Sequence, residues 1–164
     1  MPEEGKTQVV VVTQTLLPGT GFGKAFEMGA RGQAVKLLAV HHSWGRVRAE
    51  AVLRSIIGIS SNPEHATAVP PNENAFLGEK SIYGLVAFGY DVVVGAPAVQ
   101  QVTWVSAVIP LYGLIRPRRQ LMVGRYGGNF ELTWRMEVYY VPLDMEKTEL
   151  DTLNLKYGKY RRTG

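Results

Sequence analysis

Hydrophobic and polar residues alternate along residues 129–140. A period of two places successive side chains on opposite faces of a strand, whereas a helix would scatter these aromatic residues around its circumference. The pattern therefore predicts a β-strand with one buried face. The residues of that face are Phe130, Leu132, Trp134, Met136, Val138 and Tyr140.

Residues 46–59 show the same period of two, with Leu53 and Ile57 on one face and Arg48 and Arg54 on the other. The run between these two arginines contains good helix formers, so a short helix is the alternative. We favour the strand because the alternation continues into the β-branched residues that follow.

Strand-like segments recur along most of the chain, with eighteen Gly and nine Pro as turn signals between them. This spacing is typical of an antiparallel sandwich or barrel, and 164 residues suffice for one domain. We predict a single all-β sandwich domain over residues 1–164, with its core in 7–142 and a short irregular or helical basic tail in 143–164. The further strand candidates are 7–16, 33–44, 81–88, 91–94, 99–109 and 119–126.

The segments between these strands carry different signals. Gly127-Gly128 is typical of a two-residue hairpin loop, because glycine adopts positive φ without steric cost, and Gly45 marks another reversal. Residues 18–32 are predicted to be irregular, and residues 61–80 to be a long functional or mobile loop. Asp144 is placed to cap a short helical turn in the tail.

The composition excludes several classes of site. With no cysteine, the chain has no disulfide, no thiolate zinc site and no cysteine nucleophile. Acidic residues follow Pro2 where a secretory signal would be basic, which predicts synthesis without a cleaved signal. Asp91, two prolines and two glutamines interrupt the apolar stretch 85–115, so we predict no membrane-spanning segment.

No motif indicates an enzyme, a metal or a cofactor. The glycine-rich segment 17–25 has Ala25 where a phosphate-binding loop needs a hydroxyl residue after its lysine. His41 and His42 are adjacent in a predicted strand, so they should point to opposite faces, one half-buried and one exposed. No nucleophile-elbow pattern is present. We predict no catalytic residues, no metal and no cofactor.

Charge is distributed unevenly, although the net charge is only +4. No acidic residue lies between Asp91 and Glu131, where four arginines lie, and the tail adds basic residues with Tyr157 and Tyr160. Such residues can contact nucleic acid, or pair with acids of the same fold or of a neighbouring subunit. The predicted interface or nucleic-acid contacts are Arg116, Arg118, Arg119, Arg125, Lys156, Lys159, Arg161 and Arg162.

Some apolar residues occupy strand faces that solvent would reach. Val52 and Ile56 lie on the charged face of residues 46–59, and both faces of 99–109 are largely apolar. Such faces are covered either by loops of the same chain or by a partner subunit. Both explanations fit the sequence.

The sequence from Val108 to Pro117, followed by a last strand ending at Tyr140-Val141-Pro142, resembles the last strands of the single jelly-roll coat proteins of small icosahedral viruses and phages. The resemblance implies a jelly-roll-like sandwich, made in the host cytoplasm, that assembles with copies of itself or other shell proteins into a virion. A meander is the alternative topology, because a two-residue hairpin at Gly127-Gly128 would keep consecutive strands in one sheet.

We therefore expect a structural, self-assembling protein without enzymatic activity, most specifically a viral capsid subunit. Strand faces and the arginine cluster would be buried between copies, or the arginines would face nucleic acid. The alternative is a lectin-like sandwich that binds a glycan or another small molecule through exposed Trp44, Trp104 or tyrosine side chains.

Overall fold

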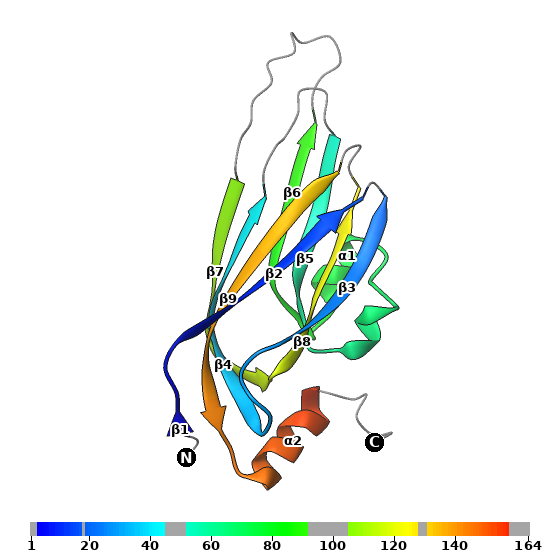
Figure 1. Cartoon of the computed structure of the whole chain (residues 1–164). Helices are drawn as coiled ribbons and strands as arrows, with labels where there is room; N and C mark the ends of the chain where they lie inside the picture. The colour runs from blue at the N-terminus through cyan, green and yellow to red at the C-terminus, as the bar shows by residue number, and fades with distance from the viewer. Residues whose placement is uncertain (1–2, 18, 45–51, 92–104, 128–130, 158–164) are drawn as a thin grey trace.

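The computed structural model describes residues 3–17, 19–44, 52–91, 105–127 and 131–157 (Figure 1). Its strands are β1 (Glu3–Glu4), β2 (Gln8–Leu16), β3 (Thr20–Glu27), β4 (Gln33–Trp44), β5 (Val52–Ser60), β6 (Ile82–Asp91), β7 (Val105–Pro117), β8 (Arg119–Tyr126) and β9 (Leu132–Asp144). Its helices are the 3₁₀ helix η1 (Pro63–Ala66), α1 (Glu73–Gly78) and α2 (Lys147–Tyr157).

The strands form two antiparallel sheets that pack face to face (Figure 1). In sheet A the order is β1-β9-β4-β7, with β2 also paired to β9, and in sheet B the order is β3-β8-β5-β6. From β2 to β9 the chain changes sheet at every step except between β5 and β6. Two sheets interleaved in this way form a jelly roll, so the prediction of an all-β, jelly-roll-like sandwich is confirmed.

The predicted hairpin at Gly127-Gly128 is wrong. β8 pairs with β3 and β5 in sheet B, whereas β9 pairs with β2 and β4 in sheet A, so the chain crosses between the sheets here. Tyr126 before the crossing and Leu132 after it are both buried in the core. Glycine indicates a change of chain direction but not the sheet to which the next strand belongs. Because β8 and β9 pair in different sheets, the meander topology is excluded.

The core lies between the sheets and includes the apolar face predicted for β9 from Leu132 to Tyr140, whereas Phe130 lies outside the described residues. The indole rings of Trp44 and Trp134 stack in it with centroids 4.2 Å apart. His42 lies beside them and joins the sheets, because its ring contacts the carbonyl oxygen of Gly84 in β6 at 2.9 Å. The indole N–H of Trp134 donates to Nδ1 of His42 at 3.0 Å, which makes Nε2 the protonated nitrogen that donates to Gly84.

Most predicted strands agree with the structure. β2, β4 and β8 match their predicted ranges to within one residue, and β6 extends past its predicted end. β5 is a strand from Val52, as we favoured over a helix, and β7 begins at Val105 and continues to Pro117. Gly45, residues 46–51 and residues 92–104 lie outside the described residues.

Residues 20–27 form β3, so the prediction of an irregular segment over 18–32 is wrong there. Glycines depress the strand signal of this segment, but Gly23 has a packing function. A Cβ at position 23 would lie 2.3 Å from the carbonyl oxygen of His65. The missing side chain therefore lets η1 approach β3 closely.

The insertion of residues 61–80 folds back over the outer face of sheet B (Figure 1). Its two helices, η1 and α1, are capped by Asn62 and Asn72, whose side chains accept hydrogen bonds from backbone N–H groups of the first turn. Phe76 of α1 is fully buried there. It belongs to a cluster with the outward side chains Ile56, Ile82, Leu121 and Val123. Loops of the same chain thus cover the apolar residue Ile56.

The C-terminal segment is helical, but Asp144 does not cap it. This residue pairs with Gln33 in sheet A, and its carboxylate accepts a hydrogen bond from the Gln33 amide at 2.9 Å. α2 begins at Lys147 and packs Leu150 and Leu153 against one end of sheet A. None of the helices in the described ranges is long and apolar enough to cross a membrane.

Candidate functional site

The predicted basic contact residues lie at separate places in the fold. The guanidinium of Arg116 lies over the ring of Tyr157, 4.1 Å from its centroid, and 5.5 Å from the ring centroid of Tyr83. These contacts join β7 to α2 and β6, so Arg116 contributes to internal packing. Lys156 lies beside the same Tyr157 ring at 5.1 Å. The remaining tail residues, Lys159, Tyr160, Arg161 and Arg162, lie outside the described residues.

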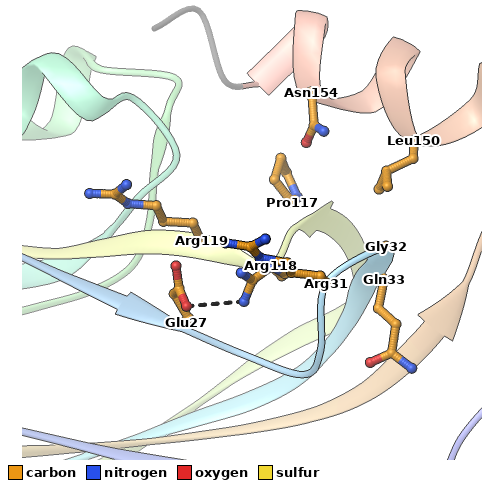
Figure 2. A pocket seen from close by; sticks show the side chains of 9 residues that line it. All are labelled: Glu27, Arg31, Gly32, Gln33, Pro117, Arg118, Arg119, Leu150 and Asn154. Atoms are coloured by element: carbon orange, nitrogen blue, oxygen red, sulfur yellow. Dashed lines mark hydrogen bonds and ion pairs between the residues drawn. The ribbon is translucent and has the colours of Figure 1, made fainter. Parts of the chain in front are cut away.

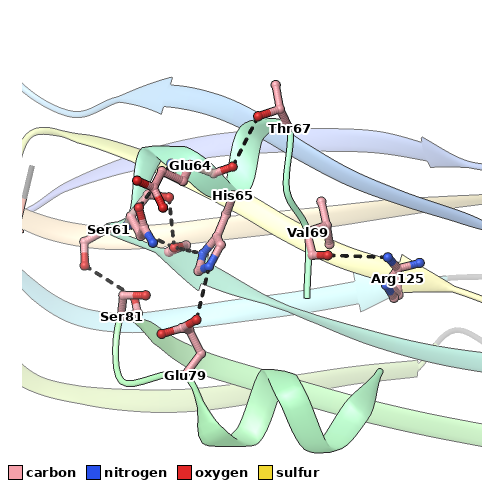
Figure 3. A network of polar contacts seen from close by, with 10 residues as sticks. Ser61, Glu64, His65, Thr67, Val69, Glu79, Ser81 and Arg125 are labelled. Carbon is pink, nitrogen blue, oxygen red and sulfur yellow. Dashed lines mark hydrogen bonds and ion pairs between the residues drawn. The ribbon is translucent and has the colours of Figure 1, made fainter. Parts of the chain in front are cut away.

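Arg125 also has an internal contact. Its guanidinium donates a hydrogen bond to the backbone carbonyl of Pro70 and another, of 3.4 Å, to that of Val69, and Figure 3 shows the second. The side chain thereby ties the insertion of residues 61–80 to β8. Its contact with nucleic acid or a neighbouring subunit stays a prediction.

Arg118 and Arg119 border a hollow of about 460 Å³ where the β3–β4 and β7–β8 connections meet α2 (Figure 2). Arg31 of the β3–β4 connection lines it as well, whereas Figure 2 shows the Arg119 guanidinium extending away from those of Arg31 and Arg118. We refer to this space as the basic hollow. It is lined by Glu27, Arg31, Gly32, Gln33, Pro117, Arg118, Arg119, Leu150 and Asn154.

Glu27 balances only part of this charge. Its Oε2 lies 3.1 Å from Nη1 of Arg118. Among the described residues, no carboxylate pairs with Arg31 or Arg119, and both side chains are exposed. Guanidinium groups bind the oxygens of phosphates and carboxylates through their fork of N–H donors. The basic hollow is therefore suited to an anion with several oxygen atoms.

Sequence reasoning did not identify Arg31 as part of this site. It lies in the segment that was predicted to be irregular, far along the chain from Arg118 and Arg119. The start of β4 pairs with the end of β7, where Ala34 lies opposite Pro117, and this register brings the two connections together. Such proximity depends on strand pairing and leaves no signal in residue spacing.

A second group of polar residues links the end of β5 to the insertion (Figure 3). The Oγ of Ser60 lies 2.6 Å from Nδ1 of His65, whose Nε2 lies 3.4 Å from a carboxylate oxygen of Glu79. Ser60 is fully buried, and its Oγ also accepts a hydrogen bond from the N–H of Asn62 at 3.0 Å. The adjacent cavity of about 70 Å³ admits only molecules of about the size of water. This geometry fits anchoring of the insertion rather than nucleophilic attack.

The outer face of sheet A carries a third group. Neighbouring strands place Val11, Glu137, His41 and Val108 in one row from β2 to β7. The carboxylate of Glu137 lies 2.9 Å from Nη2 of Arg135 and 3.7 Å from Nδ1 of His41. No described segment packs over these residues. We refer to this surface as the open face; it comprises Val9, Val11, His41, Val108, Arg135, Glu137 and Tyr139.

The pKa of Glu137 is lowered from its ordinary value. The largest cause is a hydrogen bond of 2.8 Å from the Tyr139 hydroxyl, and the positive charge of Arg135 adds to it. Glu137 is therefore held as a carboxylate within a ring of donors. The flanking valines leave an apolar rim around this charged centre.

Two further sequence expectations are settled by burial. His41 and His42 do point to opposite faces, but His42 is buried in the core, so the expectation of one exposed histidine is wrong. Trp44 is buried against Trp134, which removes it from the residues proposed to hold a glycan. Trp104 lies outside the described residues.

Within the described ranges, no group of three or more histidine, aspartate or glutamate side chains is placed to hold a metal ion. No protein-family model matches the chain, and no curated protein matches it either.

Proposed function

We propose that this chain is a structural subunit that assembles with copies of itself into a shell, as viral capsid proteins do. The observation that carries the proposal is the open face of the jelly roll. Its rim side chains Val9, Val11 and Val108 are 49%, 46% and 67% exposed, although each belongs to a regular sheet. Val9 and Val11 are neighbours on β2, and exposed apolar residues bordered by polar ones are typical of sites of protein contact.

The two outer faces of the sandwich support the same proposal. The chain covers the part of the outer face of sheet B around Ile56, Leu121 and Val123 with its own insertion. It leaves the centre of the outer face of sheet A accessible, with acid and base side by side. A second protein surface can therefore bury the valines and pair with the charges. The proposal includes no catalytic step and no cofactor.

The basic hollow provides a second contact in this proposal. Arg31 and Arg119 would contact phosphate oxygens of packaged nucleic acid, with Arg118 held in place by Glu27. Accumulation in a virion, after synthesis in the host cytoplasm, belongs to the same proposal.

The native mass of the purified chain tests the proposal. Light scattering coupled to size exclusion, at low and high salt, should show particles or oligomers of several copies, and negative-stain images should show closed shells. A monomer of 18.1 kDa at every concentration and salt would contradict assembly. In that case, binding of the monomer to a glycan array would favour the lectin-like alternative.

The contribution of the basic hollow is tested with a single-stranded oligonucleotide. Replacing either Arg31 or Arg119 singly by Gln should weaken binding and reduce the salt dependence of log K by about 1 for each lost phosphate contact. Arg135→Gln is the matched control, because Arg135 is an exposed arginine of the open face. An equal loss in both variants would show non-specific attraction to net charge and would exclude the hollow as the site.

A further inference from the structure

β2 is an edge strand whose second side is unpaired in the described structure. It pairs with β9 over all nine residues, from Gln8 to Leu16, and with no other strand. The carbonyl oxygen of Thr13 accepts a hydrogen bond from Lys24 at 2.7 Å, and that of Thr15 accepts one from the Gln14 side chain at 3.3 Å. These contacts show that odd-numbered residues direct their backbone groups away from β9. The N–H and C=O groups of Val9 and Val11 therefore point outward.

The other edges of the two sheets carry features that discourage strand addition. β7 contains Pro110 and a bulge opposite Leu38, where Tyr112 and Gly113 have φ of 53° and 72°. β6 has a register shift against β5 and a positive φ at Gly84, and β3 carries Lys24 and Glu27. Prolines, bulges and charges are the usual means by which proteins block edge-to-edge pairing.

β2 lacks all of these features. Its sequence, Gln-Val-Val-Val-Val-Thr-Gln-Thr-Leu, contains no charge, no proline and no glycine, and its register with β9 is unbroken. Valine and threonine have high strand propensity. Such a strand is the kind of edge to which another strand adds.

The chemistry of this edge specifies its partner. A row of outward N–H and C=O groups is complementary only to another extended strand. Among the described edges, β2 alone is uncharged and unbroken, so two copies of β2 pair antiparallel without opposing like charges. Two-fold symmetry satisfies both strands at once, since residue i of one copy contacts residue j of the other while j contacts i, and residues at the axis contact their own equivalents.

We propose that two copies of this chain join through their β2 edges, so that their A sheets form one continuous antiparallel sheet. This inference rests on the proposed assembly and names one of its contacts. The Val11 side chains of the two copies become cross-strand neighbours at the two-fold axis on the open face, with Val9 beside them, which reduces their exposure. The pairing ends at Thr13, because the carbonyl oxygen of Thr13 already accepts a hydrogen bond from Lys24.

Introduced cysteines locate the contact directly, because the natural chain has none. In the full chain, Val11→Cys should form disulfide-linked dimers under mild oxidation. Val108→Cys is the matched control, since Val108 is exposed in the same row at the opposite edge of sheet A. Efficient cross-linking at 108 with none at 11 would overturn the proposal.

A proline tests whether backbone hydrogen bonds make the contact. Val11→Pro removes an outward N–H that β9 does not use, and Val11→Ala removes much of the side chain but keeps the N–H. The dissociation constant of the dimer should be about tenfold or more higher for the proline variant than for the alanine variant, because each copy loses a hydrogen bond. If the proline variant loses its circular-dichroism signal of folded structure, Val11→Lys replaces it, because two opposed lysines should weaken the dimer at low salt.

Amide exchange identifies what covers the edge. Protection of Val9 and Val11 that rises with protein concentration supports a second copy, whereas the same protection at every dilution would mean that the chain covers its own edge and would overturn the inference. Wild-type chain that stays monomeric contradicts the proposed function as well. Wild-type and Val11→Pro chains that assemble equally contradict only the β2 contact.

Discussion

The two outer faces of this sandwich differ in what covers them. On sheet B, the outward side chains Ile56, Leu121 and Val123 are buried under the insertion that carries Phe76. On sheet A, the outward residues Val11 and Val108 stay exposed around Glu137. Both faces contain apolar residues at alternate positions, so alternation alone does not separate a face covered by its own chain from one that awaits a partner.

The difference lies in the connections. The β5–β6 connection is long enough to contain η1 and α1, and Arg125 of β8 fixes it by donating to two of its carbonyls. α2 covers only the end of sheet A, through Leu150 and Leu153. A face is thus closed where a long connection has both an apolar anchor and a polar tether. The centre of the open face has neither among the described segments.

The largest expected effect comes from removing the anchor of the covered face. Phe76→Ala should lower the free energy of unfolding by about 3–5 kcal/mol, the usual cost of deleting a buried phenylalanine side chain. It should also expose the outward residues of sheet B, which makes that face resemble the open face. Urea denaturation measures the stability, and binding of a hydrophobic dye measures the exposure.

Leu77→Ala is the control for this change, because Leu77 is the next residue of α1 and is 65% exposed. It should change the free energy of unfolding by no more than about 0.5 kcal/mol. Equal losses for Phe76→Ala and Leu77→Ala would mean that the insertion is not anchored through Phe76.

The second effect compares the inward and outward histidines of β4. Burial lowers the pKa of His42 to about 4, against an ordinary value of 6.5. Below pH 6.5 the unfolded chain therefore binds a proton that the folded chain does not. The contribution of His42 to the free energy of unfolding is therefore fully present above pH 6.5. It is lost as the pH drops toward 4, and the loss is about 3 kcal/mol in total.

Urea denaturation at a series of pH values between 4 and 7 measures this slope. His42→Gln should remove most of it, because the variant has no group to protonate at that position. His41→Gln should retain it, because His41 lies half-buried on the open face. If the pH dependence of stability persisted in His42→Gln and disappeared in His41→Gln, it would belong to His41 and the prediction would be wrong.

The same contrast shows which features the sequence could predict. Strands with a strong period of two, such as β4 and β8, were found almost to the residue, because burial of one face fixes the alternation. β3 was missed because Gly23 serves the packing of η1 and carries no strand signal. The sequence predicts a hairpin where the chain crosses between the sheets after β8, because the partners of β8 are strands that lie far from it in the sequence.

The candidate site was predicted in part for the same reason. Arg118 and Arg119 were identified from local charge, and both line the basic hollow. Arg31 was missed because its proximity depends on the pairing of β4 with β7. The internal contacts of Arg116 and Arg125 could not be predicted either. Their partners, an aromatic ring and two backbone carbonyls, carry no charge that would mark them as partners of arginine.

The smallest expected effect concerns the charged centre of the open face. Tyr139→Phe removes the hydrogen bond that contributes most to the low pKa of Glu137, so this pKa should rise toward its ordinary value. A carboxylate with a lowered pKa stabilises the fold above its ordinary pKa and loses that contribution as the pH falls through the lowered value. The variant should therefore lose less stability on acidification than the natural chain.

A pH titration of the Glu137 carboxyl carbon by NMR measures the change. Tyr140→Phe is the control, because Tyr140 points to the opposite face and bonds to Gln8 and Gly29 instead. Arg135→Gln should raise the pKa less than Tyr139→Phe does, because Arg135 is half-exposed and its charge is screened by solvent. A larger shift from Arg135→Gln would mean that the charge of Arg135, rather than the Tyr139 hydrogen bond, controls the pKa of Glu137. We expect the larger shift from Tyr139→Phe. The Tyr139 hydroxyl then controls the pKa of Glu137, so a partner surface that binds the open face has to keep this hydrogen bond or replace it.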